Sequence, residues 1–150
     1  MLKFVKGDIT DNQIGIIAHG CNCSGGFGSG VAGAIKKKWP DAHHQFKKNG
    51  SGKHLLGLVD LVPVKGNTRL WIANCYTQEF YGKDGQRYAS PHAIRNCLRR
   101  VYTFANEEEL PVKAPMIGCG LGGLNWDDEV EPIFQEMIEM YDIPTYVYYL

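Results

Sequence analysis

Ile14-Gly-Ile-Ile-Ala18 is an unbroken apolar run, followed by the glycine-rich stretch His19-Gly-Cys-Asn-Cys-Ser-Gly-Gly-Phe-Gly-Ser29 and then by Gly30-Val-Ala-Gly-Ala-Ile35. A short apolar run that ends in glycines is typical of a strand buried on both faces of a sheet. After the glycines, Val31, Ala34 and Ile35 recur at helical spacing and are expected to face inward, and Pro40 ends the pattern. This order predicts a strand over residues 14–18, a loop over 19–29 and a helix over 30–39.

The rest of the chain continues to alternate strands and helices. Apolar runs predict strands over residues 2–5, 58–64, 69–76, 112–117 and 145–149, and the second and third of these form an antiparallel hairpin. Helical spacing predicts helices over 41–48, 91–105 and 130–141, with Ser90 as the N-cap of the second and Pro91 at its first position. Such alternation is typical of α/β layers around a largely buried sheet, and the hairpin makes that sheet mixed.

Composition limits the classes of protein that the chain can belong to. Its 150 residues are 44% hydrophobic and 21% charged, which suits one globular domain. We expect a cytoplasmic protein without a membrane partner, because no apolar window reaches the roughly 18 residues of a membrane span and the N-terminus turns polar too early for a signal peptide. Sixteen basic residues balance sixteen acidic ones, so we expect no nucleic-acid partner held by broad electrostatic attraction.

Two glycine clusters are the strongest functional signal. Of the 18 glycines, six lie between Gly20 and Gly33 and four between Gly118 and Gly123, each cluster directly after a predicted strand. Ligands of open α/β sheets bind outside the carboxyl ends of strands, and a helix N-terminus after a glycine loop offers free N–H groups to phosphate. Two such loops facing each other suit a diphosphate.

Three other interpretations of these motifs are weaker. Gly28-Ser-Gly-Val-Ala-Gly33 has the letters of the dinucleotide-binding fingerprint, but it lies too far from the preceding strand, and Lys48 stands where that site needs an acid. His19, Cys21 and Cys23 have no second ligand pair, so we expect no metal and no other cofactor. A secreted disulfide framework is disfavoured because the five cysteines are an odd number, and we expect reduced thiols, partly buried.

Five segments in a fixed order resemble the macro domains, a family that binds ADP-ribose. The segments are Val5-Lys-Gly-Asp8-Ile9, Ala18-His-Gly-Cys-Asn22, Gly28-Ser-Gly-Val-Ala-Gly-Ala-Ile35, Ile117-Gly-Cys-Gly-Leu-Gly-Gly-Leu-Asn-Trp126 and Tyr146-Val-Tyr-Tyr-Leu150. The resemblance is greatest to the subgroup that includes ADP-ribose 1″-phosphate phosphatases and the glutamate-linked ADP-ribosyl hydrolase. It implies a single macro domain over residues 1–150, with a three-layer α/β/α fold and a central mixed sheet.

The resemblance also implies roles for individual residues. Asp8 would accept a hydrogen bond from the adenine amino group beside Ile9, Asn22 would lie near the distal ribose, and His19 would be the general acid, with Asn22 as the second catalytic residue. The remaining ligand-binding residues are those of the two loops and their neighbours: Gly25, Gly26, Phe27, Gly28, Ser29, Gly30, Val31, Thr77, Gly118, Cys119, Gly120, Leu121, Gly122, Gly123, Leu124 and Trp126. Each of the polar residues also has a structural interpretation: a turn aspartate, a loop-capping asparagine and a buried histidine bonded to its surroundings.

The expected activity is hydrolysis of ADP-ribose 1″-phosphate to ADP-ribose and phosphate, without a metal. Its ligands are then ADP-ribose and ADP-ribose 1″-phosphate, with ADP-ribosylated protein as a further partner. The alternative is a module that binds ADP-ribose without catalysis. Removal of ADP-ribose from proteins is less favoured, because Gln78 and Gly122 stand where the subgroup's hydrolase has lysine and aspartate, and Ala32 replaces the aspartate of the larger hydrolytic macro domains.

Overall fold

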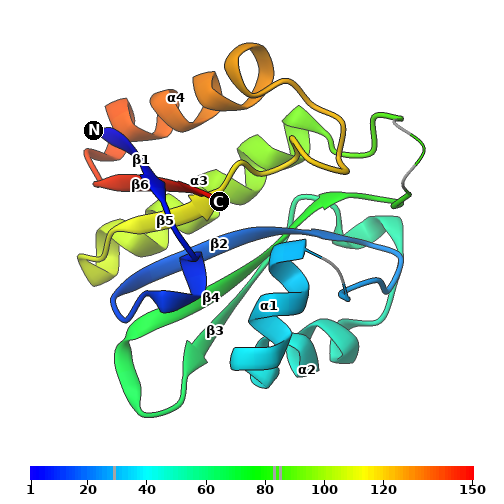
Figure 1. Ribbon diagram of the computed structural model, residues 1–150, viewed down its shortest axis with the longest axis horizontal. Helices are drawn as coiled ribbons and strands as arrows, with labels where there is room; N and C mark the ends of the chain where they lie inside the picture. Colours follow the sequence, from blue (N-terminus) through cyan, green and yellow to red (C-terminus); the bar gives the residue numbers. More distant parts are fainter. Residues whose placement is uncertain (29, 83, 85) are drawn as a thin grey trace.

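A mixed sheet forms the middle of the molecule in the computed structural model, which describes residues 1–28, 30–82, 84 and 86–150. Figure 1 shows the strands in the order β1 (Leu2–Lys6), β6 (Thr145–Tyr149), β5 (Val112–Pro115), β2 (Gly15–Asn22), β4 (Asn67–Gln78) and β3 (Val59–Val64). All neighbours pair in parallel except β3, which is antiparallel to β4. The predicted hairpin and the predicted mixed sheet are therefore confirmed.

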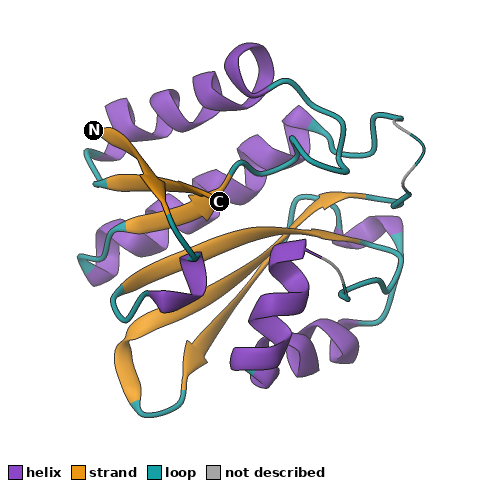
Figure 2. Ribbon diagram, in the orientation of Figure 1, coloured by secondary structure: helices purple, strands orange, loops and turns teal. Residues whose placement is uncertain are grey.

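Helices cover both faces of this sheet and complete the three-layer α/β/α fold (Figure 2). On one face lie α1 (Gly30–Lys38) and α2 (Pro40–Asn49), and on the other lie α3 (Pro91–Glu108) and α4 (Glu131–Tyr141). Shorter helical turns are Ile9–Asp11, Lys53–Leu55 and a π-helical turn, Trp126–Val130, directly before α4. Among the described residues, no helix is long and apolar enough to cross a membrane.

The alternation of side chains along β2 explains why the sheet has a core on each face. Ile16 and Ala18 belong to the core under α3 and α4, whereas Ile17 belongs to the core under α1 and α2. All three are fully buried, as the unbroken apolar run predicts. Ser90 caps α3 by accepting a hydrogen bond from the Ala93 N–H at 3.1 Å, which confirms the predicted helix start.

Several predicted boundaries are wrong. The central strand does not end at residue 18: β2 continues to Asn22, because residues 19–22 pair with β4 through a register shift at Cys21 and Asn22. The fifth strand ends at Pro115 instead of residue 117, and Ala34 of α1 is exposed instead of inward. Pro40 ends α1 as predicted, but it also opens α2, since proline is well tolerated in a first helical turn.

Candidate functional site

A cavity of about 810 Å³ lies at the carboxyl ends of β2, β4, β5 and β6. Cavities of this size bind small molecules, and the carboxyl edge is where open α/β sheets bind them. The described residues that line it are His19, Gly20, Cys21, Asn22, Gly26, Phe27, Gly28, Gly30, Val31, Ala32, Thr77, Gln78, Tyr81, Gly82, Pro115, Met116, Ile117, Gly118, Cys119, Gly120, Leu121, Gly122, Tyr148 and Tyr149. The described lining includes no lysine or arginine, so any anion here must rely on uncharged donors, such as backbone N–H groups.

Most of the residues expected at the site lie around this cavity, but not all. The two glycine loops, which are far apart in sequence, face each other across it through residues 26–28, 30–31 and 118–122. Six predicted residues are not part of its described lining: Asp8, Ile9, Gly25, Gly123, Leu124 and Trp126. Trp126 instead packs between Phe4 and Phe134 in the core. Ser29 lies outside the described residues.

Asn22 holds the first glycine loop in place. Its side-chain Oδ1 accepts hydrogen bonds from the N–H groups of Ser24 and Gly26, both at 3.0 Å, and its Nδ2 donates to the Gly26 carbonyl at 2.8 Å. The loop then closes tightly on α1, since a Cβ atom at Gly33 would lie only 2.9 Å from the Gly28 carbonyl oxygen. Asn22 therefore caps the loop and lines the cavity at the same time.

The second loop has no room for a side chain at Gly122. A Cβ atom there would lie 2.6 Å from the Gly118 carbonyl oxygen and 3.0 Å from the Ala89 Cβ, closer than real Cβ contacts. The loop is also closed by a hydrogen bond from the Leu124 N–H to the Gly118 carbonyl at 2.9 Å. An aspartate at position 122 would consequently require the backbone to move.

His19 is buried at the edge of the cavity and is held in one tautomer. Its Nε2 lies 2.7 Å from Oδ1 of Asn74, whose Nδ2 donates to the Ala42 carbonyl at 2.9 Å and to Asp60 at 3.2 Å. Because both of those partners only accept, Asn74 must present its oxygen to His19, and Nε2 must carry the proton. Burial lowers the pKa of His19 to about 4, although the hydrogen bond with Asn74 opposes this shift. The ring is therefore neutral near pH 7.

Behind His19, a network of polar side chains continues beneath α2. The Asp60 carboxylate accepts hydrogen bonds from Asn49 at 2.6 Å and from the Tyr76 hydroxyl at 3.1 Å, in addition to the one from Asn74. Burial raises the pKa of Tyr76, so its hydroxyl stays protonated and able to donate. We did not predict Asn74 from the sequence, although a fully buried asparagine within an apolar strand is itself a signal of a specific hydrogen bond.

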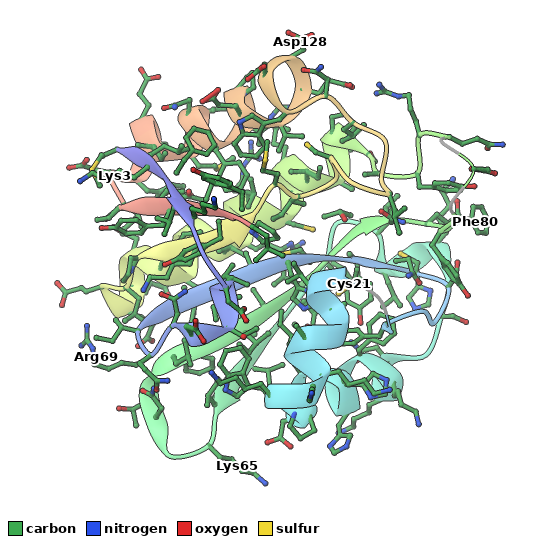
Figure 3. The ribbon with its side chains drawn as sticks, viewed as in Figure 1. Lys3, Cys21, Lys65, Arg69, Phe80 and Asp128 are labelled. Atoms are coloured by element: carbon green, nitrogen blue, oxygen red, sulfur yellow. The ribbon has the colours of Figure 1, made fainter. Side chains whose placement is uncertain are left out.

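The five cysteines are free thiols, four of them buried and Cys119 half-buried. Burial raises the pKa of Cys21 well above its ordinary value, and it raises the pKa of both Cys23 and Cys119 to about 11. Since the thiolate is the nucleophile, these three groups are poorly suited to attack a substrate near neutral pH. Figure 3 marks Cys21 close to the start of α1. Within the described part of the chain, no three His, Cys, Asp or Glu side chains group as metal ligands do.

The cavity also includes residues that the sequence analysis missed. Tyr81 lies in the polar segment after β4, Met116 follows β5, and Tyr148 and Tyr149 end β6. The three residues at the ends of β5 and β6 follow from the rule that ligand sites lie at carboxyl ends of strands. Tyr81 has no such signal, because the polar, turn-rich sequence around it is typical of an ordinary surface loop.

Asp8 occupies the turn after β1, next to the cavity edge. Its Oδ1 accepts hydrogen bonds from the N–H and the hydroxyl of Thr10, at 2.9 and 2.7 Å, and thereby caps the helical turn Ile9–Asp11. These bonds lower the pKa of Asp8, so its carboxylate is charged at neutral pH. The preceding Gly7 donates its N–H to the Tyr149 carbonyl at 2.8 Å, which connects this turn to the cavity lining.

The three-layer fold and the glycine-walled cavity define an α/β protein that binds a small molecule at the carboxyl edge of its sheet. The chain belongs to the macro domain family, whose model, described as Macro domain, matches residues 18–133. The family predicted from the sequence motifs is thus confirmed.

Individual relatives cover nearly the whole chain. A protein from Meyerozyma guilliermondii named ADP-ribose 1″-phosphate phosphatase is 31% identical over 175 residues, which cover 95% of this chain and 98% of the relative. A protein of the same name from Candida albicans is 26% identical over 147 residues, covering 91% and 93% of the two chains. A solved structure from Bacteroides thetaiotaomicron, described as a protein of unknown function, superimposes with a TM-score of 0.86 at 34% identity and covers 100% of this chain and 98% of its own.

Proposed function

We propose that the cavity binds ADP-ribose and that the chain hydrolyses ADP-ribose 1″-phosphate to ADP-ribose and inorganic phosphate. The observation that carries this proposal is the pair of glycine loops facing each other across a cavity of about 810 Å³. The N-terminus of α1 opens into the same cavity through Gly30 and Val31, so its N–H groups and partial positive charge favour a diphosphate. The names of the two yeast relatives support the phosphatase activity.

The reaction needs a water oxygen to bond to phosphorus while the bond between phosphorus and the ribose oxygen breaks. A proton must also reach the departing ribose oxygen. His19 does not suit the predicted role of general acid in this geometry, because its ring is neutral and its one N–H is committed to Asn74. The lone pair on Nδ1, which lies 3.9 Å from the Cys21 Sγ, suits a proton acceptor instead. With a pKa of about 4 it is a weak base, and we therefore expect slow turnover.

The same observations favour a second candidate, a module that binds ADP-ribose without turning it over. Among the described residues that line the cavity, no reactive thiol lies beside a base. The N–H of His19 is used in its hydrogen bond to Asn74, behind the cavity. Removal of ADP-ribose from proteins stays the weakest candidate. Gly122 has no room for a side chain, and Gln78 uses its amide to donate to the Phe80 carbonyl at 2.7 Å.

Phosphate release separates the first two candidates. We expect the protein to release inorganic phosphate from saturating ADP-ribose 1″-phosphate faster than the buffer does, and to bind ADP-ribose in isothermal titration. Tight binding with a release rate equal to the buffer rate would leave only the binding module. Absence of both would contradict the proposed ligand itself.

A charged side chain at Gly28 tests where the diphosphate lies. Gly28 lines the cavity, and a Cβ atom there would meet nothing within 4 Å, so a side chain fits. Gly28→Glu should weaken ADP-ribose binding at least tenfold more than Gly28→Gln, since two charges at about 6 Å repel by roughly 3 kcal/mol at an effective dielectric constant of about 20. Titration calorimetry of both variants measures this difference. Equal affinities would show that no phosphate approaches this loop.

Removing each partner of one hydrogen bond in turn tests where the adenine of ADP-ribose binds. Asp8→Ala removes a charge-assisted hydrogen bond to the adenine amino group, and ADP-ribose affinity should fall about ten- to a hundredfold. The hypoxanthine analogue of ADP-ribose lacks that amino group, so the unaltered protein should bind it more weakly than ADP-ribose by a similar factor. The two losses should not add, because each removes the same bond.

The control for this cycle is Thr10→Val, which removes the hydroxyl that donates to Asp8 but keeps the carboxylate. It should change ADP-ribose affinity less than threefold. Fully additive losses in the cycle would mean that Asp8 only caps the turn Ile9–Asp11 and that adenine binds elsewhere.

A further inference from the structure

The charged residues are unevenly distributed along the chain, although its net charge is zero. Residues 1–69 contain ten Lys or Arg and four Asp or Glu, whereas residues 70–150 contain six and twelve. The imbalance is greatest over residues 30–54, with six lysines and one acid, and over residues 125–142, with seven acids and no Lys or Arg. The first segment forms α1, α2 and the turn Lys53–Leu55, and the second forms the π-helical turn and α4.

The fold places these two segments on opposite sides of the sheet. Figure 1 shows α4 at the top of the molecule and α1 and α2 at the bottom, with the sheet between them. Figure 3 marks Asp128 at the upper end of the same view. The separation lies across the sheet, so the overall net charge of zero conceals one basic and one acidic face. The expectation of no nucleic-acid partner rests on that net charge and therefore does not apply to the basic face alone.

Five exposed lysines make up what we call the lysine face: Lys36, Lys37, Lys47, Lys48 and Lys53. Among the described residues, none of the ion pairs involves any of them; Asp41, the acid of this segment, instead approaches His44 and Lys65. Lys38 is excluded, because its ammonium group donates to the Thr10 carbonyl.

This face adjoins the cavity. Phe27 lines the cavity, and its ring lies 5.2 Å from the ring of His43 on α2. Burial lowers the pKa of His43, and the positive charges of Lys36 and Lys47 lower it further. Through this ring contact, α2, which carries Lys47 and Lys48, adjoins the Phe27 wall of the cavity.

We infer that the lysine face is a docking surface for a nucleic-acid strand, held through its phosphodiester backbone. Unpaired lysines with flexible stems suit a row of phosphates, which they neutralise with release of counterions. A protein partner is less suited, because interface centres are depleted in lysine and rich in aromatic side chains, and no large hydrophobic residue within residues 30–54 is among the exposed ones. The inference is independent of the proposed hydrolysis.

Fluorescence anisotropy with labelled 12-nucleotide single strands, one DNA and one RNA, tests the inference without ADP-ribose. We expect both strands to bind with dissociation constants of about 1–100 μM in low salt, in the range of non-specific binding. The variant Lys36→Glu/Lys47→Glu/Lys48→Glu should bind at least thirtyfold more weakly. Its affinity should also depend less on salt. The slope of the logarithm of the binding constant against the logarithm of salt concentration should be smaller in magnitude by about 2, since each lost phosphate contact contributes about 0.7 for single strands.

The matched control is Arg69→Glu/Arg99→Glu/Arg100→Glu, which changes net charge equally at exposed positions outside the lysine face. It should bind within about threefold of the unaltered protein, and circular dichroism should show both variants folded. Absence of binding by the unaltered protein, or equal losses in the two variants, would overturn the inference. A third outcome would also overturn it: no strand binding, together with self-association in sedimentation that rises with protein concentration and is lost in the lysine variant. The lysine face would then bind the acidic face of another copy of the chain.

Discussion

Asn74→Leu is expected to lower the free energy of unfolding by about 3–5 kcal/mol. Asn74 is fully buried, and its side chain makes hydrogen bonds to His19, Ala42 and Asp60. Leucine has a similar volume but leaves the buried His19 N–H without a partner, at a cost of about 1–3 kcal/mol. The Ala42 carbonyl loses its bond from Asn74 but keeps its bond within α2. The Asp60 carboxylate loses one of its three donors as well.

Urea denaturation monitored by circular dichroism measures this loss. The matched control is Ile72→Val, two residues earlier in β4 and equally buried, where a single methylene group is removed and the cost should be about 1 kcal/mol. If Asn74→Leu proved no more costly than Ile72→Val, the hydrogen bonds around Asn74 would contribute little, and the tautomer assigned to His19 would lose its basis.

The fold was largely predictable because its signals are local. The apolar run 14–18, the Ser90 cap and the hairpin each depend on a few adjacent residues, and the structure has all three, although Ile14 is exposed and lies just before β2. The exact end of β2 depends on pairing with β4, a strand some fifty residues away in sequence, so no local pattern marks it. Likewise, glycine at positions 20 and 25 suggests a loop, although Gly20 is part of the strand.

The two backbone loops of the site could be predicted from the sequence, whereas the hydrogen bonds and charge states of its side chains could not. Glycine clusters mark the two loops, since close backbone approach needs glycine, as at Gly33 and Gly122. The charge state of His19 is set by Asn74 and by burial, neither of which a sequence shows. The same holds for Asn22, whose bonds to its own loop depend on the loop's path.

The stability of the protein should fall between pH 6.5 and pH 4 because of His19. Its pKa is about 4 in the folded state against an ordinary 6.5, so within this window the unfolded chain binds a proton that the folded protein excludes. Unfolding is then favoured as the pH falls, whereas above pH 6.5 the ring is neutral in both states and has no effect. A pKa difference of this size corresponds to about 3 kcal/mol over the whole window.

His19→Gln isolates this contribution from the carboxylates that titrate in the same range. Glutamine keeps an N–H donor for Asn74 but does not titrate, so between pH 7.5 and pH 4.5 the variant should lose about 2–3 kcal/mol less stability than the unaltered protein. Urea unfolding at half-unit pH steps gives the two curves. Parallel curves would mean that His19 protonates without penalty in the folded state, and its neutral form could then no longer be used to argue against a general acid.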